Sequence, residues 1–355
     1  MLTIKDIARE LNISSSTISR ALNNKPGVSK TLKERIQAIA SNLGYHPNYK
    51  ARALVGCRIG VIGVIIPRSS EFIFSNPFYP EILKGIGTVA RNSNYNVLLS
   101  FEGADSYASI FLKGLVDGII VLAHRINDEK ISELEKRKIP TILIPGFIKN
   151  SESTLPSVNN ENIESVCRAT DHLIKIGHKR IAFILGALNS KFTIERLEGY
   201  KRAFAENHLP VLQEYIRESD FTKKDGVRLM RELLALPVPP TAVIGVNDKV
   251  TFGAVQTIVN SGMEIPKDIS VITIGDSEYV SDFTPQLTAI RIHLAEIGKK
   301  ATQTLLNILN GTKLRKKKII LPSEFIVRGS TARPRTDGFI VKASPSKPIP
   351  SHSAQ

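Results

Sequence analysis

Residues 14–24, SSSTISRALNN, place small hydroxyl groups and one arginine side by side near the N-terminus. On a helical projection Ser15, Ser16 and Arg20 lie on one face, and the opposite face is apolar around Ile18. Hydroxyls can hydrogen-bond phosphates or base edges without bulk, and an arginine can donate two hydrogen bonds to guanine. A serine-rich segment of this kind can also be no more than a good helix cap. The residue types therefore leave two interpretations, a surface that reads DNA or a capped helix start.

Three short helices are predicted around this stretch. Thr3 and Asp6 form a capping pair before a first apolar helical face, and Ser14 is the expected N-cap of a second helix. A third helix is expected from about Ser29 to residue 43, ended by Gly44. Two short helices joined by a tight turn and backed by a third make a helix-turn-helix unit. In such a unit the second helix places its N-terminal residues in the major groove.

The positive charge of the chain is unevenly distributed. The sequence carries a formal net charge of +15, and residues 1–58 hold ten Lys/Arg against three Asp/Glu, a net of +7. The tail 333–355 has a net of +3, and the run KLRKKK (313–318) supplies five of the positive charges in between. The rest of the central region is near neutral. A small basic module on a neutral body indicates a polyanionic partner for that module, whereas KLRKKK is interpreted as a solvated loop between a helix and a strand.

From residue 58 onward the pattern changes to apolar runs of strand length that alternate with amphipathic helices. Near-continuous apolar strands between helices predict parallel sheets in a doubly wound α/β arrangement. Two successive sets predict two lobes with a cleft between them, and ligands of such folds bind at the carboxyl ends of the strands. The first set is RIGVIGVIIP, NVLLS, GIIVL and TILIP, and the second is RIAFILG, TAVIGVN and SVITIG.

The sequence shows no signature of catalysis or of metal binding. No GxGxxG follows an expected strand, because Gly85 and Gly87 fall inside a helical pattern, and no P-loop, GxSxG or HExxH motif occurs. His178 lies between an expected helix and an expected strand and is interpreted as structural. Cys57 and Cys167 are far apart, so neither a disulfide nor a metal site is expected. We therefore expect no enzymatic activity and no cofactor.

The first 56 residues resemble the DNA-binding headpiece of the LacI/GalR family of bacterial transcriptional regulators. The resemblance is carried by TIKDIARELNISSSTISRALNN, by VSKTLKERIQAIASNLGYHPN and by ARAL. It implies two groups of contacts with double-stranded DNA. The implied base-reading residues are Ser15, Ser16 and Arg20, and the implied phosphate-contacting residues are Thr3, Ser14 and Thr17.

The same resemblance implies a hinge helix at residues 48–54 that forms on DNA. Leu54 matches the leucine that is wedged into the minor groove at the operator centre, and Ala51 matches its small neighbour. Apolar wedges of this kind unstack a base step and bend the duplex. The segment can also be read as a flexible linker, and both readings hold if it is disordered alone and helical on DNA.

The body resembles the same family and, through it, the periplasmic sugar-binding proteins, as far as about residue 332. The matching phrases are VDGII, HLIKIGHKRIAFILG, RLEGYKRAF, PTAVIGVND, IPKDISVITIGDS and FTPQLTAI. The resemblance implies a small-molecule effector, a mono- or oligosaccharide, held between the lobes by an arginine, polar groups and aromatic rings. The implied effector contacts are Phe78, Tyr79, Arg196, Phe221, Asn247, Asp248 and Asp276.

Two segments depart from the family pattern. Gly275 and Asp276 stand where many members have two acids, and the first of these usually touches the ligand. Asp276 therefore either substitutes for that acid or faces elsewhere. Residues 101–115 are shorter than the usual helix-bearing segment before VDGII, which would trim one edge of the first lobe. The phrases PRSSEFIFSNPFYPEIL and SVNNEN look most like the maltose or maltodextrin branch, which favours a disaccharide or oligosaccharide over a purine and leaves a phosphorylated sugar as an alternative.

The expected organisation has four parts. They are a helix-turn-helix headpiece (1–46), a hinge helix (47–57), a two-lobed effector-binding and dimerisation domain (58–332) and a disordered tail rich in Pro and Ser (333–355). The tail lacks the leucine heptads of a tetramerising helix, so we expect dimers. The N-terminus lacks a signal-peptide pattern and no apolar run reaches 18 residues, so we expect a cytoplasmic protein with no membrane partner.

The expected function is that of a dimeric transcriptional repressor. Its two headpieces would read a palindromic operator, and an effector bound between the lobes would control that binding. The alternative is a soluble sugar-binding protein or carbohydrate enzyme whose basic N-terminus is incidental. Sequence-specific DNA binding that depends on Arg20 and Leu54 distinguishes the two.

Overall fold

The structure, a computed structural model, divides the chain into two compact units, one up to Ile59 and one from Gly60 onward. The predicted hinge at 47–57, with Ala51 and Leu54, lies outside the described residues. So does the predicted tail beyond Arg335. The described residues are 3–22, 26–44, 58–101, 103, 106–126, 128–145 and 154–335, without the side chains of Tyr279 and Ser281.

The first unit is a small three-helix domain, which we call the headpiece. Its predicted helices are confirmed as α1 (Ile4–Leu11), α2 (Ser15–Leu22) and α3 (Lys30–Asn42). Asn12 ends α1 in the left-handed conformation (φ 50°), so the turn to α2 is tight. The apolar faces of the three helices form one buried core, made of Ile7, Ala8, Ile18, Ala21, Ile36 and Ala40.

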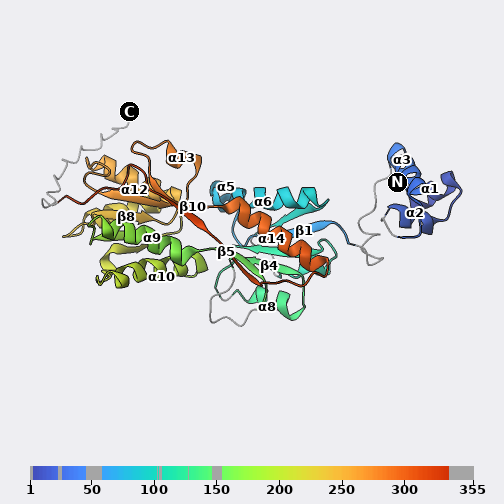
Figure 1. Cartoon of the computed structure of the whole chain (residues 1–355), viewed down its shortest axis with the longest axis horizontal. Coiled ribbons are helices and arrows are strands. Elements are labelled where there is room, and N and C mark those ends of the chain that lie inside the picture. Colours follow the sequence, from blue (N-terminus) through green and yellow to red (C-terminus); the bar gives the residue numbers. More distant parts are fainter. Residues whose placement is uncertain are drawn as a thin grey trace, which may run out of the picture. The chain divides into compact units, whose positions relative to one another are not determined.

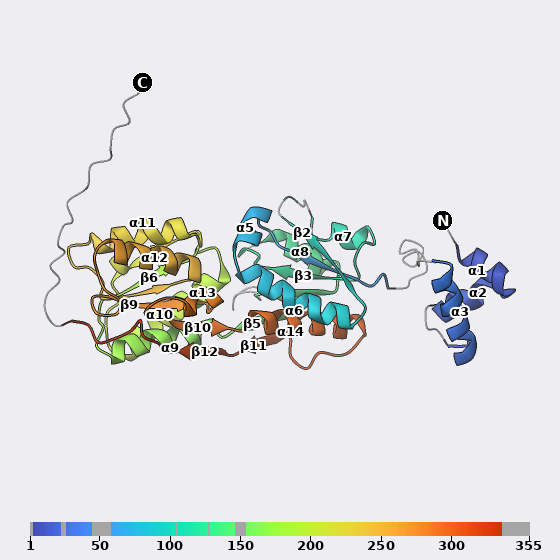
Figure 2. The ribbon, with the colours of Figure 1, turned by 90° about the horizontal axis from the view of Figure 1, so that it is seen from above.

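The second unit, which we call the body, contains two six-stranded sheets (Figures 1 and 2). The first has the order β11-β5-β4-β3-β1-β2 and is parallel throughout. Its strands are β1 (Val61–Ile65), β2 (Asn96–Ser100), β3 (Gly118–Leu122), β4 (Thr141–Ile144), β5 (Ser157–Asn160) and β11 (Lys318–Leu321).

The second sheet has the order β12-β10-β9-β8-β6-β7 and is parallel except for β12, which runs antiparallel to β10. Its strands are β6 (Ile181–Leu185), β7 (Ile216–Glu218), β8 (Ala242–Gly245), β9 (Ser270–Ile274), β10 (Thr288–Ile292) and β12 (Ser323–Ile326). All seven apolar runs predicted to be strands are strands in these two sheets, and the two-lobed α/β fold is confirmed.

Helices cover both faces of each sheet, as a doubly wound fold requires. The helices of the first lobe are α5 (Ser70–Ser75), α6 (Phe78–Asn92), α7 (Ser109–Leu112), α8 (Glu129–Lys136) and α14 (Leu294–Leu309). Those of the second lobe are α9 (Asn162–Lys175), α10 (Lys191–Glu206), the 3-10 helix η1 (Gln213–Tyr215), α11 (Lys223–Leu234), α12 (Asp248–Asn260) and α13 (Glu278–Ser281). None of the helices that the structure describes combines the length and the apolar character needed to cross a membrane.

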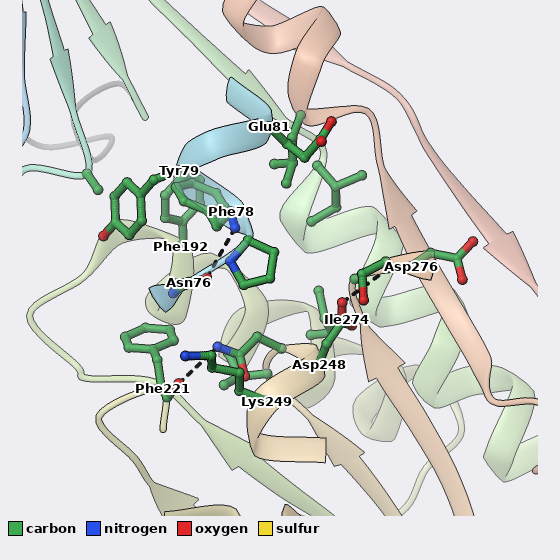
Figure 3. Close-up of a pocket in the computed structure, with 18 of the residues that line it drawn as sticks. Asn76, Phe78, Tyr79, Glu81, Phe192, Phe221, Asp248, Lys249, Ile274 and Asp276 are labelled. Carbon is green, nitrogen blue, oxygen red and sulfur yellow. Dashed lines mark hydrogen bonds between the residues drawn. The ribbon is translucent and has the colours of Figure 1, made fainter. Parts of the chain in front are cut away.

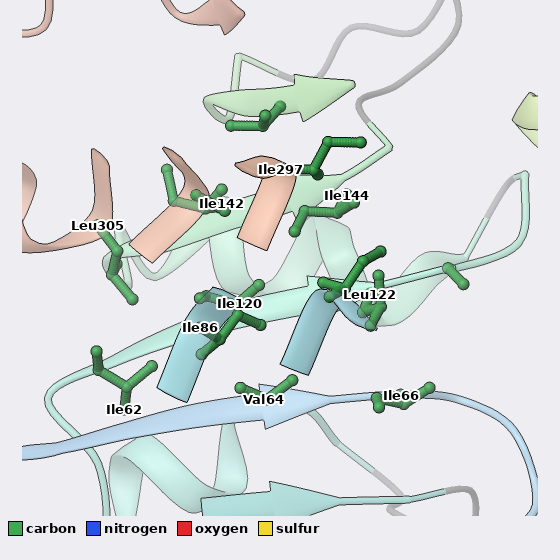
Figure 4. Packing of buried hydrophobic residues seen from close by; sticks show 14 of the residues in the cluster. Ile62, Val64, Ile66, Ile86, Ile120, Leu122, Ile142, Ile144, Ile297 and Leu305 are labelled. Carbon is green, nitrogen blue, oxygen red and sulfur yellow. The ribbon is translucent and has the colours of Figure 1, made fainter. Parts of the chain in front are cut away.

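The core of the first lobe is built where α6 and α14 pack on the sheet (Figure 4). Side chains such as Ile62, Ile86 and Leu305 are fully buried there. Gly85 allows the two helices to approach closely, because a Cβ atom at this position would lie 1.9 Å from the carbonyl oxygen of Ala295. The other face of the sheet carries only the four-residue α7 together with α8. That residues 101–115 are shorter than the corresponding family segment stays a prediction.

The chain crosses between the lobes three times, and a single residue separates the elements at each crossing. These residues are Glu161 between β5 and α9, His293 between β10 and α14, and Pro322 between β11 and β12. The strands of both sheets end at the cleft, and β12 continues from β11 straight across it. β12 therefore has to run away from the cleft, which explains why this one strand is antiparallel to its neighbour β10. The described chain extends past the predicted end of the body to Arg335, which donates a hydrogen bond to Asp268 (2.8 Å).

Candidate functional site

The exposed face of α2 carries the residues predicted to read bases. Ile18 is fully buried in the headpiece core, whereas Ser16 and Arg20 are exposed and Ser15 is half-buried. The guanidinium of Arg20 lies beside the turn after α2, since a Cβ atom at Gly27 would sit 3.5 Å from its Nη1. The face thus presents hydroxyl groups and one cation to the outside of the domain.

Three hydroxyls form one hydrogen-bonded cluster at the start of α2. The Oγ atom of Ser14 accepts a hydrogen bond from the backbone N–H of Thr17 (3.1 Å) and thereby caps the helix. The same oxygen lies 2.8 Å from the hydroxyls of both Ser16 and Thr17. Capping and DNA binding are compatible here, because a helix N-terminus is itself favourable for phosphate.

Thr3 is held by Asp6 at the start of α1. Its backbone N–H (2.8 Å) and its hydroxyl (2.7 Å) both donate to the Asp6 carboxylate. These hydrogen bonds lower the pKa of Asp6. The predicted contact of the Thr3 hydroxyl with phosphate therefore has to replace a hydrogen bond that already exists.

A cavity of about 940 Å³ lies between the two lobes, at the carboxyl ends of their strands (Figure 3). This size is typical of sites for small organic ligands. Five aromatic side chains reach the cavity from both lobes, and all seven predicted effector contacts line it. The aromatic residues are Phe72, Phe78, Tyr79, Phe192 and Phe221.

Arg196, on α10, is buried in the wall of this cavity with only 6% of its surface exposed. Its Nε donates to Oδ1 of Asn162 (3.2 Å) and its Nη1 donates to the carbonyl of Val246 (3.0 Å). Burial lowers the pKa of Arg196 to about 10, and the nearby charge of Glu195 acts in the opposite direction. Among the described residues no partner contacts Nη2, so a fixed and desolvated donor remains for a ligand.

Glu195 is part of the polar network that fixes Arg196, and sequence reasoning missed this role. Its Oε2 accepts hydrogen bonds from the side-chain amides of Asn159 (2.9 Å) and Asn162 (2.8 Å). Nζ of Lys191, one turn earlier on α10, lies 3.2 Å from Oε1 of Glu195. The segment after β5 and the helix α10 are thus tied together at the first crossing between the lobes.

Asn247 and Asp248 are held rigidly at the start of α12. Oδ1 of Asn247 caps the helix by accepting from the N–H of Val250 (2.8 Å). The Asp248 carboxylate accepts from the hydroxyl of Thr273 (3.1 Å) and from the backbone N–H of Ser277 (3.2 Å). Burial raises the pKa of Asp248, although the hydrogen bonds from Ser277 and Thr273 oppose this effect.

The glycine that departs from the family pattern is explained by Asp248. Gly275 has a φ of 130°, and a Cβ atom there would lie 2.4 Å from Oδ1 of Asp248. An acid therefore does not fit at position 275 in this arrangement. Asp248 occupies the space that such a side chain would take.

Asp276 lies in the wall of the cavity, but its carboxylate is engaged by two arginines. Oδ2 lies 2.7 Å from Nη2 of Arg291, and Oδ1 lies 2.8 Å from Nη1 of Arg328. Burial acts to raise the pKa of Asp276, and the hydrogen bonds from Arg328 and Arg291 outweigh it, so the pKa is lowered. Of the two roles left open by the sequence, the structure agrees with a carboxylate that faces its own lobe.

The aromatic residues contact one another across the cleft. The rings of Phe78 and Phe192 meet edge-to-face with centroids 5.5 Å apart, and they come from different lobes. Tyr79 is only 4% exposed, so it is mainly part of the cavity wall. Phe221 has a positive φ of 62°, and its carbonyl accepts from Nδ2 of Asn247 (3.2 Å). Phe192 was not predicted, although it lies four residues before Arg196 on the same helix face.

A second contact between the lobes joins Arg125 to Asn189. The guanidinium of Arg125 donates to the side-chain carbonyl of Asn189, and the N–H of Ile126 donates to its backbone carbonyl (3.0 Å). Arg125 also lines the cavity, and nothing in the sequence alone pairs the two residues.

Comparison with known families identifies both parts of the chain. Residues 3–48 match the model of the bacterial regulatory proteins of the lacI family. Residues 170–331 match the periplasmic binding protein-like domain. The headpiece and the second lobe are therefore each similar to a known domain.

Known regulators are similar over almost the full chain. Catabolite control protein A of Priestia megaterium is 31% identical over 336 residues, which cover 93% of this chain and 99% of the relative. The probable HTH-type transcriptional repressor ExuR of Bacillus subtilis is 32% identical over 335 residues, with coverages of 94% and 99%.

Solved structures show the same architecture. The Lac repressor bound to ONPG in the repressed state has a TM-score of 0.78 at 26% identity, and it covers 93% of this chain and 99% of its own. The complex of the transcriptional regulator CelR with cellobiose has a TM-score of 0.72 at 25% identity, with coverages of 93% and 100%.

Proposed function

Because this chain belongs to the lacI family of bacterial regulatory proteins, we propose that it is a repressor controlled by a sugar bound between its two lobes. DNA binding and transcription regulation follow from the family. The buried, fixed guanidinium of Arg196 in an aromatic-lined cleft supports the control by a ligand. The headpiece (1–46) and the hinge (47–57) bind DNA, the body (58–332) binds the ligand, and the tail (333–355) is given no role in this proposal.

In this proposal α2 lies in the major groove. Ser15, Ser16 and Arg20 contact base edges, and Ser14 and Thr17 contact phosphates together with Thr3 of α1. The positions of these side chains on the exposed side of the headpiece support this assignment. Residues 47–57 form the hinge, and Leu54 and Ala51 enter the minor groove.

The effector is a neutral sugar of disaccharide size or larger. The free donor of Arg196 and the acceptor oxygens of Asp248 match sugar hydroxyls, with Asn247 beside them, and the rings of Phe78 and Phe221 match the apolar faces of sugar rings. The charges of the cavity wall are balanced, which disfavours a phosphorylated ligand. The cationic lining residues are Arg68, Lys84, Arg125, Arg196, Lys249 and Arg291, and the acidic ones are Glu81, Asp220, Asp248, Asp276, Glu278 and Glu296.

Two copies of the chain bind one operator, and they contact each other through an apolar patch on the first lobe. Exposed apolar side chains lie on α5, at Phe74, and on the edge strand β2. Phe74 is 61% exposed and meets Phe101 edge-to-face, and Val97 and Leu99 on β2 are 36% and 37% exposed. Reading a palindrome needs two headpieces related by twofold symmetry, so a second copy is the partner that this patch fits.

Ligand binding controls DNA binding by changing the angle between the lobes. Three single-residue crossings connect them, so the lobes can rotate without a change in either sheet. A sugar that contacts Arg196 and Asp248 on one side and Phe78 on the other favours one angle over the others. Through the dimer contact on the first lobe, that angle sets the fraction of dimers that can engage both half-sites.

We place the protein in the cytoplasm, where operator DNA is found, and assign it no enzymatic activity. The alternative of a sugar-binding protein or carbohydrate enzyme with an incidental basic N-terminus is disfavoured, because the relatives that are similar over more than nine-tenths of the chain are regulators.

The test is a selection of bound duplexes from a random DNA library at a stated salt concentration, followed by a sugar titration on the selected duplex. We expect an enriched near-palindrome with a flexible central step. Neutral disaccharides should shift the melting temperature of the protein and change its DNA affinity, whereas their phosphorylated forms should not. Binding that is not sequence-selective and that weakens only with salt would contradict the proposal.

A further inference from the structure

The edge of the first sheet that lies away from the cleft is rich in cations. The strands of this sheet are all parallel, so their N-terminal ends share one edge. Nine lysine and arginine side chains lie in the turns and helix ends before these strands or, for Lys318, at the first residue of β11, and all nine are exposed. We call this set the basic edge: Arg91, Lys113, Lys136, Lys138, Lys313, Arg315, Lys316, Lys317 and Lys318.

These cations are not neutralised within the described part of the protein. The ion pairs of the described residues include none of the nine. The sequence predicted KLRKKK to be a solvated loop, and the structure does place residues 310–317 between α14 and β11. It adds that four more cations, on other segments, gather along the same edge.

The acids of this edge are already engaged in contacts within the body. Asp117 accepts hydrogen bonds from the backbone N–H groups of Gly60 (2.7 Å) and Val61 (3.3 Å). Glu133 pairs with Arg137 (2.9 Å), and Glu135 accepts from the N–H of Thr154 (2.6 Å). The edge therefore presents mostly positive charge to solvent, in contrast to the balanced charges at the cleft end of the same strands.

The dimensions and the position of the basic edge suit a DNA backbone. Six strands spaced about 4.8 Å apart give it a width of about 24 Å, which corresponds to about seven base pairs. The chain that comes from the headpiece enters the body at this same edge, at Gly60, where Asp117 fixes it. An interface for duplex phosphates needs cations and no particular side-chain geometry.

We propose that the basic edge binds the phosphate backbone of DNA that flanks the operator, outside the bases read by the headpiece. This inference rests on the proposed function, because it presupposes that the headpiece holds the operator. The edge adds affinity that depends on salt and on duplex length, and it adds no sequence preference.

The experiment compares the full-length protein with the variant Lys313→Ala/Arg315→Ala/Lys316→Ala, whose side chains lie in the loop before β11. A matched control, Lys179→Ala/Lys201→Ala/Lys224→Ala, removes three exposed cations from the second lobe. Operator affinity is measured against salt concentration on a duplex trimmed to the operator and on one with long flanks. On the long duplex we expect the slope of log Kobs against log salt to be smaller in magnitude by at least about 2 in the edge variant, since each lost phosphate contact reduces that magnitude by about 0.9.

On the trimmed duplex the edge variant, the control and the wild type should have the same slope. Equal slopes for the edge variant and the wild type on the long duplex would overturn the proposal and leave the edge to a different, non-DNA partner. An equal loss on both duplexes would also overturn it. The proposed function is tested separately by the preference of the wild type for the trimmed operator over a random duplex, which does not involve the edge.

Discussion

Arg20 is the side chain on which sequence-specific recognition by the headpiece should depend most. It is exposed on α2 and free to reach a base edge. Replacing it by alanine should lower operator affinity by roughly 1–3 kcal/mol and relax discrimination at one base pair of each half-site. Arg35→Ala, which removes the same charge from the exposed side of α3, is the control and should act almost equally on operator and random DNA. Competition binding between the two kinds of DNA decides between these outcomes.

Arg196 and Asp276 both line the cleft, but their substitutions should have different effects. Arg196→Ala should abolish the thermal shift caused by a sugar while operator binding persists, because it removes the fixed donor. Asp276→Asn leaves Arg328, which is only 14% exposed, without its carboxylate partner, whereas Arg291 keeps Glu324. We expect it to lower the free energy of unfolding by about 3 kcal/mol and to leave sugar affinity nearly unchanged. A loss of sugar binding in a fully stable Asp276→Asn protein would make this carboxylate a ligand contact.

His178 should make the stability of the second lobe sensitive to acid. It is 1% exposed, and its ring contacts Thr241 (2.8 Å) and the carbonyl of Ala332 (2.8 Å). Burial lowers its pKa from 6.5 to about 4. The unfolded chain therefore binds more protons than the native state between these values, and stability falls as the pH drops from about 6.5 toward 4.

Between pH 7.5 and pH 5 this residue should cost about 2 kcal/mol of unfolding free energy. In His178→Gln, which does not titrate, the decrease over the same range should be smaller by that amount. Urea denaturation of both proteins at the two pH values measures the difference. An identical pH dependence of the two proteins would show that the His178 ring is protonated in the native state or that other residues cause the loss of stability at low pH.

Sequence reasoning predicted a role for most of these residues but did not predict the residues that hold them in place. Arg196 was placed in the cleft by resemblance, yet its fixing by Asn162 depends on a contact across 34 positions. The pairing of Asp276 with Arg328 spans 52 positions. A pattern of residue types carries no information about such pairs, because the first is set by how α9 and α10 pack and the second by how β12 joins the second sheet beside β10.

Among the secondary-structure elements, the strands with long apolar runs could be predicted from the sequence. The strands with continuous buried runs, such as β3 and β6, could be predicted because nothing else explains four or five consecutive apolar residues. Among the strands that were not predicted, β5, β7 and β12 are three or four residues long and contain polar side chains, and β10 contains Arg291. These strands pair with segments distant in the sequence, such as β5 with β11 and β10 with β12, so their existence depends on the complete fold.

The crossing of α6 and α14 can be tested at one position, with a control in the same helix. A methyl group at Gly85 would lie 1.9 Å from the carbonyl oxygen of Ala295, so Gly85→Ala should force the two helices apart. We expect a loss of at least about 2 kcal/mol in unfolding free energy. A methyl group at Gly87, half a turn away, would have no atom within 4 Å among its neighbours in the described structure. Gly87→Ala should therefore be neutral or stabilising by up to about 1 kcal/mol. Equal effects of the two substitutions would show that the helices separate without cost.

For the whole molecule, the two lobes and the headpiece perform different steps of one regulatory cycle. The headpiece has its own core and the body has separate cores on the faces of each sheet. The lobes meet through a small number of contacts, among them Phe78 with Phe192 and Arg125 with Asn189. Contacts of this size can be exchanged for contacts with a ligand, which is what control by lobe rotation requires.

In the proposed mechanism, dimerisation through the first lobe links that rotation to DNA, and a substitution of Leu99 tests it. Leu99 lies on the edge strand β2 and is 37% exposed, so Leu99→Glu places a charge in the proposed contact without opening the core. We expect the protein to become monomeric at micromolar concentration and to lose operator affinity by at least about tenfold, since one chain holds only one half-site. The control is Ile320→Glu on β11, the opposite edge strand of the same sheet, which is 66% exposed and should leave the dimer and the affinity for an operator trimmed of its flanks unchanged. Sedimentation and operator titration measure the two properties, and circular dichroism checks the fold. A dimeric Leu99→Glu protein would move the interface to the second lobe, and the lobe angle would then have to reach DNA by another route.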